Sequence, residues 1–136
     1  MTGSLAADLA EVRRAVLRIA AGRPVVLGDE TGETSALVFA AERATTEVLA
    51  FVVRHGSGLV GAALDAATCT RLRLVPQRAG TSGTDHGPLT AVDLVGTGTG
   101  ISASARARTV AALADPGTAA GDLIRPGHVL PLRAAA

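Results

Sequence analysis

The chain of 136 residues, 48% of them apolar, is long enough for one domain with a single core. Its 13 basic and 12 acidic residues leave a formal net charge of +1, and only two residues are aromatic. It therefore lacks the basic stripe with interleaved aromatic side chains that is typical of nucleic-acid-binding proteins. The single cysteine, Cys69, cannot form an intramolecular disulfide, and no apolar run reaches the ~20 residues that span a bilayer. We therefore expect a soluble, cytoplasmic protein that binds neither nucleic acid nor membrane.

The first forty residues predict a helix followed by a hairpin. Apolar residues recur at helical spacing over 5–21, and a glycine and a proline follow directly and end this amphipathic segment. Residues 25–27 read as a short buried strand, and residues 36–40 as a second strand. The polar, glycine-containing turn over 28–34 joins them and favours a hairpin.

The remainder of the chain alternates strands and helices. Helices are expected at 46–53, 65–74 and 103–113, and strands at 59–64, 90–95 and 128–133. Residues 76–88 contain little apolar material and are expected to form a long loop, which in compact domains is often functional. The alternation predicts a single domain over 1–136 of the α+β or α/β class, in which one mixed sheet is flanked by helices.

The strongest candidate catalytic residue lies in the segment Arg125-Pro-Gly-His-Val-Leu-Pro-Leu-Arg133. Its two prolines fix φ, and Gly127 permits conformations closed to other residues, so His128 is expected on a constrained turn that opens an apolar strand. Histidine is the side chain best suited to proton transfer near neutral pH. His128 is therefore a candidate general acid or base, and a structural turn histidine is the alternative.

Three carboxylates in the first predicted turn form a candidate metal site. Asp29, Glu30 and Glu33 could bind Mg²⁺, which prefers carboxylate oxygen and retains several waters. The alternative interpretation is a solvated hairpin tip. The other two histidines, His55 and His86, are too dispersed to show zinc-ligand spacing.

The glycine-rich segment Gly96-Thr-Gly-Thr-Gly100 could bring backbone N–H groups close to a phosphate. No Gly-Lys-Ser/Thr follows it, and the spacing of the dinucleotide-binding glycines is not met. We therefore interpret it as a tight turn between a strand and a helix.

Taken in order, three segments resemble the 3,4-dihydroxy-2-butanone 4-phosphate synthase family. They are Arg54-His-Gly-Ser-Gly-Leu-Val60, then Thr99-Gly-Ile-Ser-Ala103 with Arg106 and Thr109, then Asp122-Leu-Ile-Arg-Pro-Gly-His-Val-Leu-Pro-Leu-Arg133. The resemblance implies an α+β homodimer with active sites near the dimer interface. It also implies a Mg²⁺-dependent lyase of riboflavin biosynthesis that converts ribulose 5-phosphate to formate and dihydroxybutanone phosphate. By position, His128 matches the family's histidine and Thr99 its substrate-contacting threonine.

Other positions depart from the family pattern. In the acidic turn, Thr31 stands where the family has its substrate-binding arginine and Gly32 where it has a metal-binding glutamate, so only a one-residue slip brings Glu33 to the metal position. The family's sequences also continue for about 70 residues beyond the position matching the end of this one, with a further metal-binding histidine. Without these metal ligands, the chain would lack the electrostatic stabilisation that a bound metal supplies to the reaction.

These departures lead to two functional hypotheses. The first is a divergent synthase-like lyase of reduced or lost activity, with His128 as acid or base, Thr99 as substrate contact and Mg²⁺ at Asp29, Glu30 or Glu33. The second is a non-catalytic binding or assembly subunit that keeps the family's dimer surface and its pocket.

Overall fold

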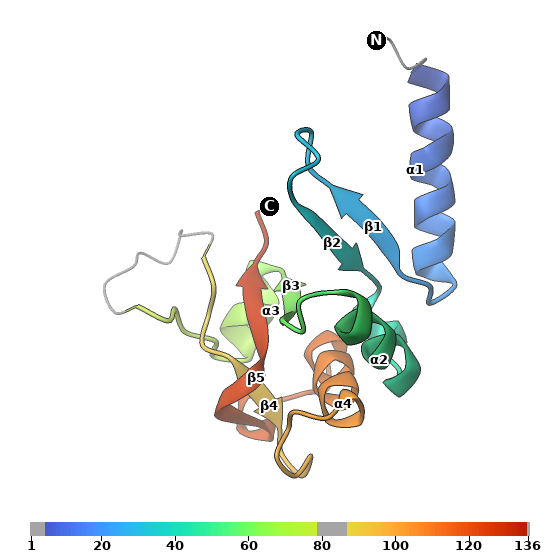
Figure 1. Ribbon diagram of the computed structural model, residues 1–136. Helices are drawn as coiled ribbons and strands as arrows, with labels where there is room; N and C mark the ends of the chain where they lie inside the picture. Colours follow the sequence, from blue (N-terminus) through green and yellow to red (C-terminus); the bar gives the residue numbers. More distant parts are fainter. Residues whose placement is uncertain (1–4, 79–86, 136) are drawn as a thin grey trace.

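The structure, a computed structural model, describes residues 5–78 and 87–135 (Figure 1). Its central sheet consists of β3 (Val60–Leu64), β4 (Val92–Leu94) and β5 (Leu123–Arg133) in the order β3-β5-β4. β5 pairs in parallel with β3 and antiparallel with β4. The α+β class and a mixed sheet are therefore confirmed.

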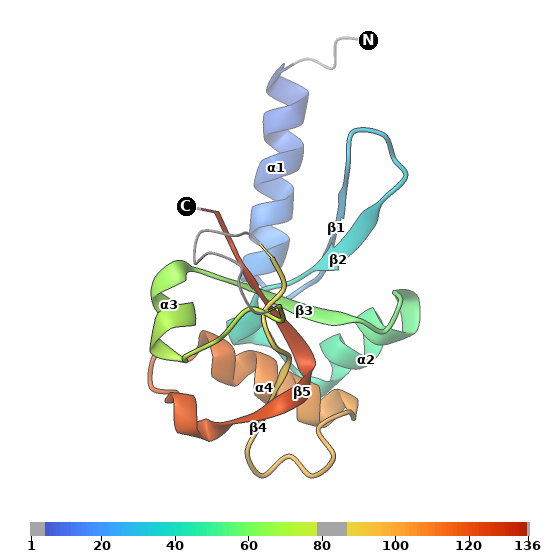
Figure 2. The same cartoon turned by 90° about the vertical axis from the view of Figure 1, so that its left-hand side faces the viewer.

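Helices cover one face of this sheet. α4 (Ala103–Ala114) lies along all three strands, and α2 (Thr46–His55) and the short 3-10 helix η1 (Ala41–Arg43) pack on α4 (Figures 1 and 2). α3 (Ala66–Arg71) follows β3. The core between these elements is mostly aliphatic, as the scarcity of aromatic residues requires; its largest fully buried side chains are Leu49, Leu72, Leu113, Val92, Val129, Thr109, Pro131 and Cys69.

Short polar side chains define where the helices begin. The N-cap residues Thr45, Asp65 and Ser102 each accept a hydrogen bond from the backbone N–H three residues later, at 3.2, 2.6 and 3.0 Å. These bonds satisfy N–H groups that have no partner inside the helix.

The N-terminal elements stand away from this body. α1 (Leu5–Ala20) and the hairpin of β1 (Val25–Gly28) and β2 (Ser35–Val38) extend to one side of it in both views (Figures 1 and 2). β1 and β2 pair with each other and form a second sheet, so the expected single sheet is wrong. Residues 25–27 form a strand, as expected, but the expected burial is wrong, because Val26 is 71% exposed.

Two strand boundaries differ from the prediction. β5 begins at Leu123 rather than at 128, preceded by the 3-10 helix η2 (Ala120–Asp122), because Leu123 and Ile124 also pair with β4. β4 is shorter than the apolar run at 90–95. Most of the predicted loop at 76–88, including His86, lies outside the described residues. Among the described helices, none is long and apolar enough to cross a membrane.

Candidate active site

An irregularity in the pairing of β4 with β5 builds the candidate site. Val92 pairs with Val129, but the next residue, Asp93, pairs with Ile124, so residues 125–128 fit between two adjacent rungs of the ladder. The backbone of this segment passes very close to β4: a Cβ placed on Gly127 would lie 2.1 Å from the Val92 carbonyl carbon. Glycine is therefore required at 127, and the close approach brings His128 beside Asp93.

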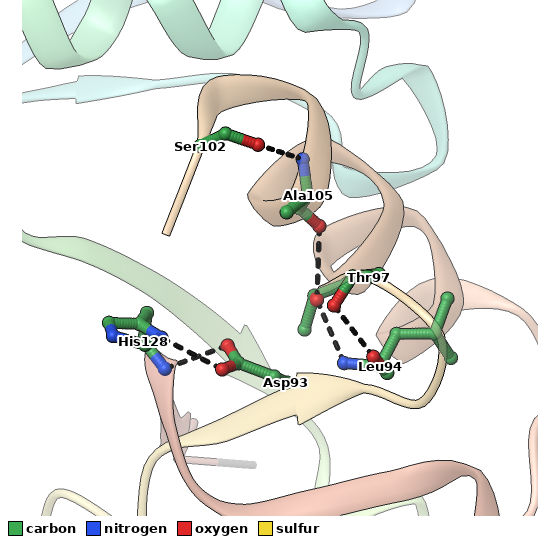
Figure 3. A network of polar contacts seen from close by, with 7 residues as sticks. Asp93, Leu94, Thr97, Ser102, Ala105 and His128 are labelled. Atoms are coloured by element: carbon green, nitrogen blue, oxygen red, sulfur yellow. Dashed lines mark hydrogen bonds and ion pairs between the residues drawn. The ribbon is translucent and has the colours of Figure 1, made fainter. Parts of the chain in front are cut away.

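Asp93 and His128 form a double contact (Figure 3). One carboxylate oxygen of Asp93, Oδ1, accepts the backbone N–H of His128 at 2.8 Å, and the other, Oδ2, lies 2.8 Å from the ring atom Nδ1. The Asp93 side chain is 10% exposed, whereas that of His128 is 40% exposed. The carboxylate is thus enclosed, while the imidazole remains accessible to a substrate.

The glycine-rich turn after β4 closes over the same carboxylate. A Cβ on Gly100 would lie 2.1 Å from Asp93 Oδ2, and Gly100 has φ +78°, so both space and backbone conformation favour glycine here. Thr99, which precedes Gly100, is exposed. The structure therefore brings the turn that carries Thr99 to the Asp93–His128 pair, and the interpretation of 96–100 as a strand-to-helix turn is confirmed.

The Thr109 side chain of α4 and the Thr97 side chain of the turn itself hold the turn and the neighbouring strand in place. The buried Thr109 hydroxyl accepts the N–H of Leu94 at 3.0 Å and donates to the Ala105 carbonyl at 3.1 Å. The Thr97 hydroxyl donates to the Leu94 carbonyl at 2.7 Å (Figure 3). The backbone of Leu94, the residue next to Asp93, is therefore hydrogen-bonded at both its N–H and its carbonyl.

The candidate metal ligands lie elsewhere. Asp29, Glu30 and Glu33 are exposed in the turn between β1 and β2, which extends away from the three-stranded sheet (Figure 1). The Thr31 hydroxyl donates to the Asp29 carboxylate at 2.9 Å and lowers the pKa of that carboxyl. In the described ranges, no three His, Cys, Asp or Glu side chains come together in a way that could hold a metal ion. The described residues thus do not form a three-ligand magnesium site.

His55 and Cys69 lie on helices rather than on the strands and the turn that form this site. His55 lies in the last turn of α2, and its ring centroid is 4.6 Å from that of Phe51. Cys69 is buried in α3, with its sulfur 3.9 Å from the Leu64 carbonyl oxygen.

Asp93 is the site residue that the sequence analysis missed. Its strand reads as an ordinary apolar segment, Thr90-Ala-Val-Asp-Leu-Val95. The available signal was the carboxylate itself, because Asp is rarely buried without a partner. That signal gives no information on the partner, which lies 35 residues along the chain.

Comparison with known proteins places this site in a family. The family model described as 3,4-dihydroxy-2-butanone 4-phosphate synthase matches residues 13–136. The chain belongs to this synthase family. Similar curated proteins are the riboflavin biosynthesis protein RibBA of Rhodococcus jostii, 49% identical over 90% of this chain and 30% of that protein, and its Mycobacterium tuberculosis counterpart, 50% identical over 93% and 31%.

Solved synthase structures share the fold. A 3,4-dihydroxy-2-butanone 4-phosphate synthase in complex with two magnesium ions is 38% identical, with a TM-score of 0.83 over 92% of this chain and 60% of that chain. A two-domain synthase from A. baumannii, RibBX, is 34% identical, with a TM-score of 0.81 over 90% and 37%. The chain thus spans about a third of the length of these curated relatives and three fifths of the magnesium-bound synthase.

Proposed function

We propose that this chain catalyses the family's lyase reaction, the conversion of ribulose 5-phosphate to formate and dihydroxybutanone phosphate, at a rate below that of the longer synthases. The proposal places the chain in riboflavin biosynthesis. His128 acts as general acid or base, and Thr99 contacts the sugar phosphate.

The observation that carries the proposal is the accessible His128 ring held on the buried Asp93 carboxylate. An ionised carboxylate can only accept hydrogen bonds, so the neutral ring carries its proton on Nδ1 and has Nε2 free to take one. A base at Nε2 can remove a proton from the carbon next to the carbonyl of a ketose, the first step of an enolisation. Thr99 precedes Gly100 on the turn that packs against Asp93, and we propose that its exposed hydroxyl contacts the substrate there.

The experiment is a direct assay for product. Purified protein is incubated with ribulose 5-phosphate and Mg²⁺, and formate is followed by NMR. We expect slow release above buffer that His128→Ala reduces by about 10²-fold or more, and that the control His55→Ala leaves unchanged. Absence of release from the folded wild-type chain would overturn the proposal.

The proposal includes the binding of Mg²⁺ by the turn carboxylates Asp29, Glu30 and Glu33. Mg²⁺ commonly binds through one or two carboxylates and keeps its other waters, so we propose weak binding there, and no catalytic step is derived from it. Titration with Mg²⁺ is expected to shift the amide NMR signals of this turn, and Glu33→Gln to weaken the shift. Unchanged signals would contradict magnesium binding at the turn.

A non-catalytic assembly role is the second candidate, and the exposure of α1 favours it. No residue of this helix is buried, although its apolar residues recur at 5, 9, 12, 16 and 19. This alternation of four- and three-residue steps is typical of helices that pair along a narrow seam. We propose a second copy of the chain as the partner; a dimer by light scattering without formate release would favour this role. The expected cytoplasmic location stays a prediction.

A further inference from the structure

We propose that Asp93 is the positioning residue of this site. It selects the tautomer of His128 with the proton on Nδ1 and fixes Nε2 as the atom that exchanges a proton with substrate. The catalytic consequence rests on the proposed function, whereas the choice of tautomer is a property of the chain itself.

The two carboxylate oxygens of Asp93 hold His128 at two points. The bond to the backbone N–H fixes where the residue lies, and the contact to Nδ1 fixes how the ring is turned. A single contact would leave the ring free to rotate about its χ angles. With both contacts at 2.8 Å, the ring has one favoured orientation, and Nε2, on its opposite side, is not used by Asp93.

The fold in turn prevents the carboxylate from moving. The backbone of Gly127 packs on the Val92–Asp93 peptide, and Gly100 lies directly against Oδ2. Leu94, the residue that follows Asp93, donates its backbone N–H to the Thr109 hydroxyl. Asp93 is therefore enclosed by two close backbone approaches and an anchored neighbour, which is the support that a precisely oriented site residue needs.

Asparagine at position 93 provides a sharp test, because it has nearly the same shape and the opposite hydrogen-bonding pattern at one atom. Its carbonyl oxygen can still accept the His128 backbone N–H, but its NH₂ group can only donate to Nδ1. The Asp93→Asn variant should therefore move the ring proton from Nδ1 to Nε2. A merely structural role of Asp93 would leave the tautomer unchanged.

The measurement is the ¹⁵N NMR spectrum of the histidine rings at about pH 9, which is above the ordinary pKa of a histidine side chain, about 6.5. We expect the Nδ1–H tautomer for His128 in the wild-type chain and the Nε2–H tautomer in Asp93→Asn. His55 in the same spectrum and the exposed control Asp115→Asn should show no change. An Nε2–H tautomer in the wild-type chain, or an unchanged tautomer in folded Asp93→Asn, would overturn the inference. The wild-type spectrum decides alone if the variant does not fold.

Formate release separates this inference from the proposed function. If the wild-type chain is active, Asp93→Asn should lower kcat by about 10²- to 10⁴-fold, the usual range for a lost acid or base, with little change in KM. An unchanged kcat in the inverted tautomer would overturn the catalytic part. If the wild-type chain is inactive, the proposed function fails, while the ring spectra still confirm or overturn the tautomer selection.

Discussion

At the scale of single residues, burial controls the reactivity of the Cys69 thiol. Desolvation by burial is the main cause that raises its pKa, and the thiolate is the form that reacts. We expect an aromatic disulfide reagent to label Cys69 slowly in the native chain and rapidly in urea. Ser104→Cys adds an exposed thiol on α4 as a control that should react at once. Equal labelling of Cys69 under both conditions would contradict the prediction.

The Asp65 carboxyl makes the stability of the folded chain depend on pH. The backbone N–H of Thr68 donates to its carboxylate at 2.6 Å and is the main cause that lowers its pKa from the ordinary value of 3.8. A carboxyl whose pKa is lower in the folded chain stabilises it fully above 3.8, and this contribution is lost as the pH falls through the lower, folded value.

The test compares Asp65→Asn with the wild-type chain. Asparagine is also a good N-cap but does not titrate, so the variant should lose less stability than the wild type between about pH 5 and pH 3. Urea unfolding at several pH values measures the difference. Parallel stability curves would show that Asp65 makes no titrating contribution.

At the scale of elements, α4 begins with a cap whose loss can be measured. The Ser102 hydroxyl oxygen accepts the N–H of Ala105 at 3.0 Å. We expect Ser102→Ala to lower the free energy of unfolding by about 1 kcal/mol. Ser104→Ala, two residues later inside the helix, should change it by less than about 0.5 kcal/mol. Equal effects of the two substitutions in urea unfolding would contradict a capping role.

The pairing of β4 with β5 predicts a larger effect. A methyl group at Gly127 would overlap the backbone of Val92 and Asp93, so Gly127→Ala should destabilise the chain by about 3 kcal/mol or more. Gly121→Ala is the matched control, because a Cβ there meets no atom within 4 Å, and its effect should stay within about 0.5 kcal/mol. A small effect at 127 would mean that β5 can move away from β4.

Local signals predicted most elements and the hairpin of β1 and β2, but not the pairings between strands far apart in sequence. Capping residues, helical spacing and glycine-rich turns placed α1, α2 and α4 within a few residues, because each of these signals acts over one or two turns of chain. The hairpin of β1 and β2 was predicted, but its separation from the main sheet was not, since the apolar run at 25–27 has the same pattern whether or not another element covers it. The pairing of Asp93 with His128 depends on an irregular register between strands far apart in sequence, which no local pattern encodes.

At the scale of the whole molecule, the distribution of apolar surface is uneven. The body around the three-stranded sheet encloses the core and also exposes some large apolar residues, whereas α1 exposes large apolar residues and has no buried residue. Those on α1 are Leu5, Leu9, Val12, Val16 and Leu17. Exposed apolar residues that are contiguous, rather than scattered singly, mark surfaces that associate.

We therefore expect the purified chain to self-associate through α1, with a mass above the 13.5 kDa of one copy. The double substitution Leu9→Glu with Val16→Glu places charges in the apolar seam of α1 (residues 5, 9, 12, 16 and 19). It should shift the chain toward monomer, because burying an unpaired charge in an apolar contact is costly. Ala7→Glu changes the charge on the other side of the same helix and should leave the mass unchanged. Light scattering from low to high micromolar concentration measures all three. A wild-type mass of one copy throughout would contradict association, and equal effects of Ala7→Glu would show that net charge, not the seam, controls it.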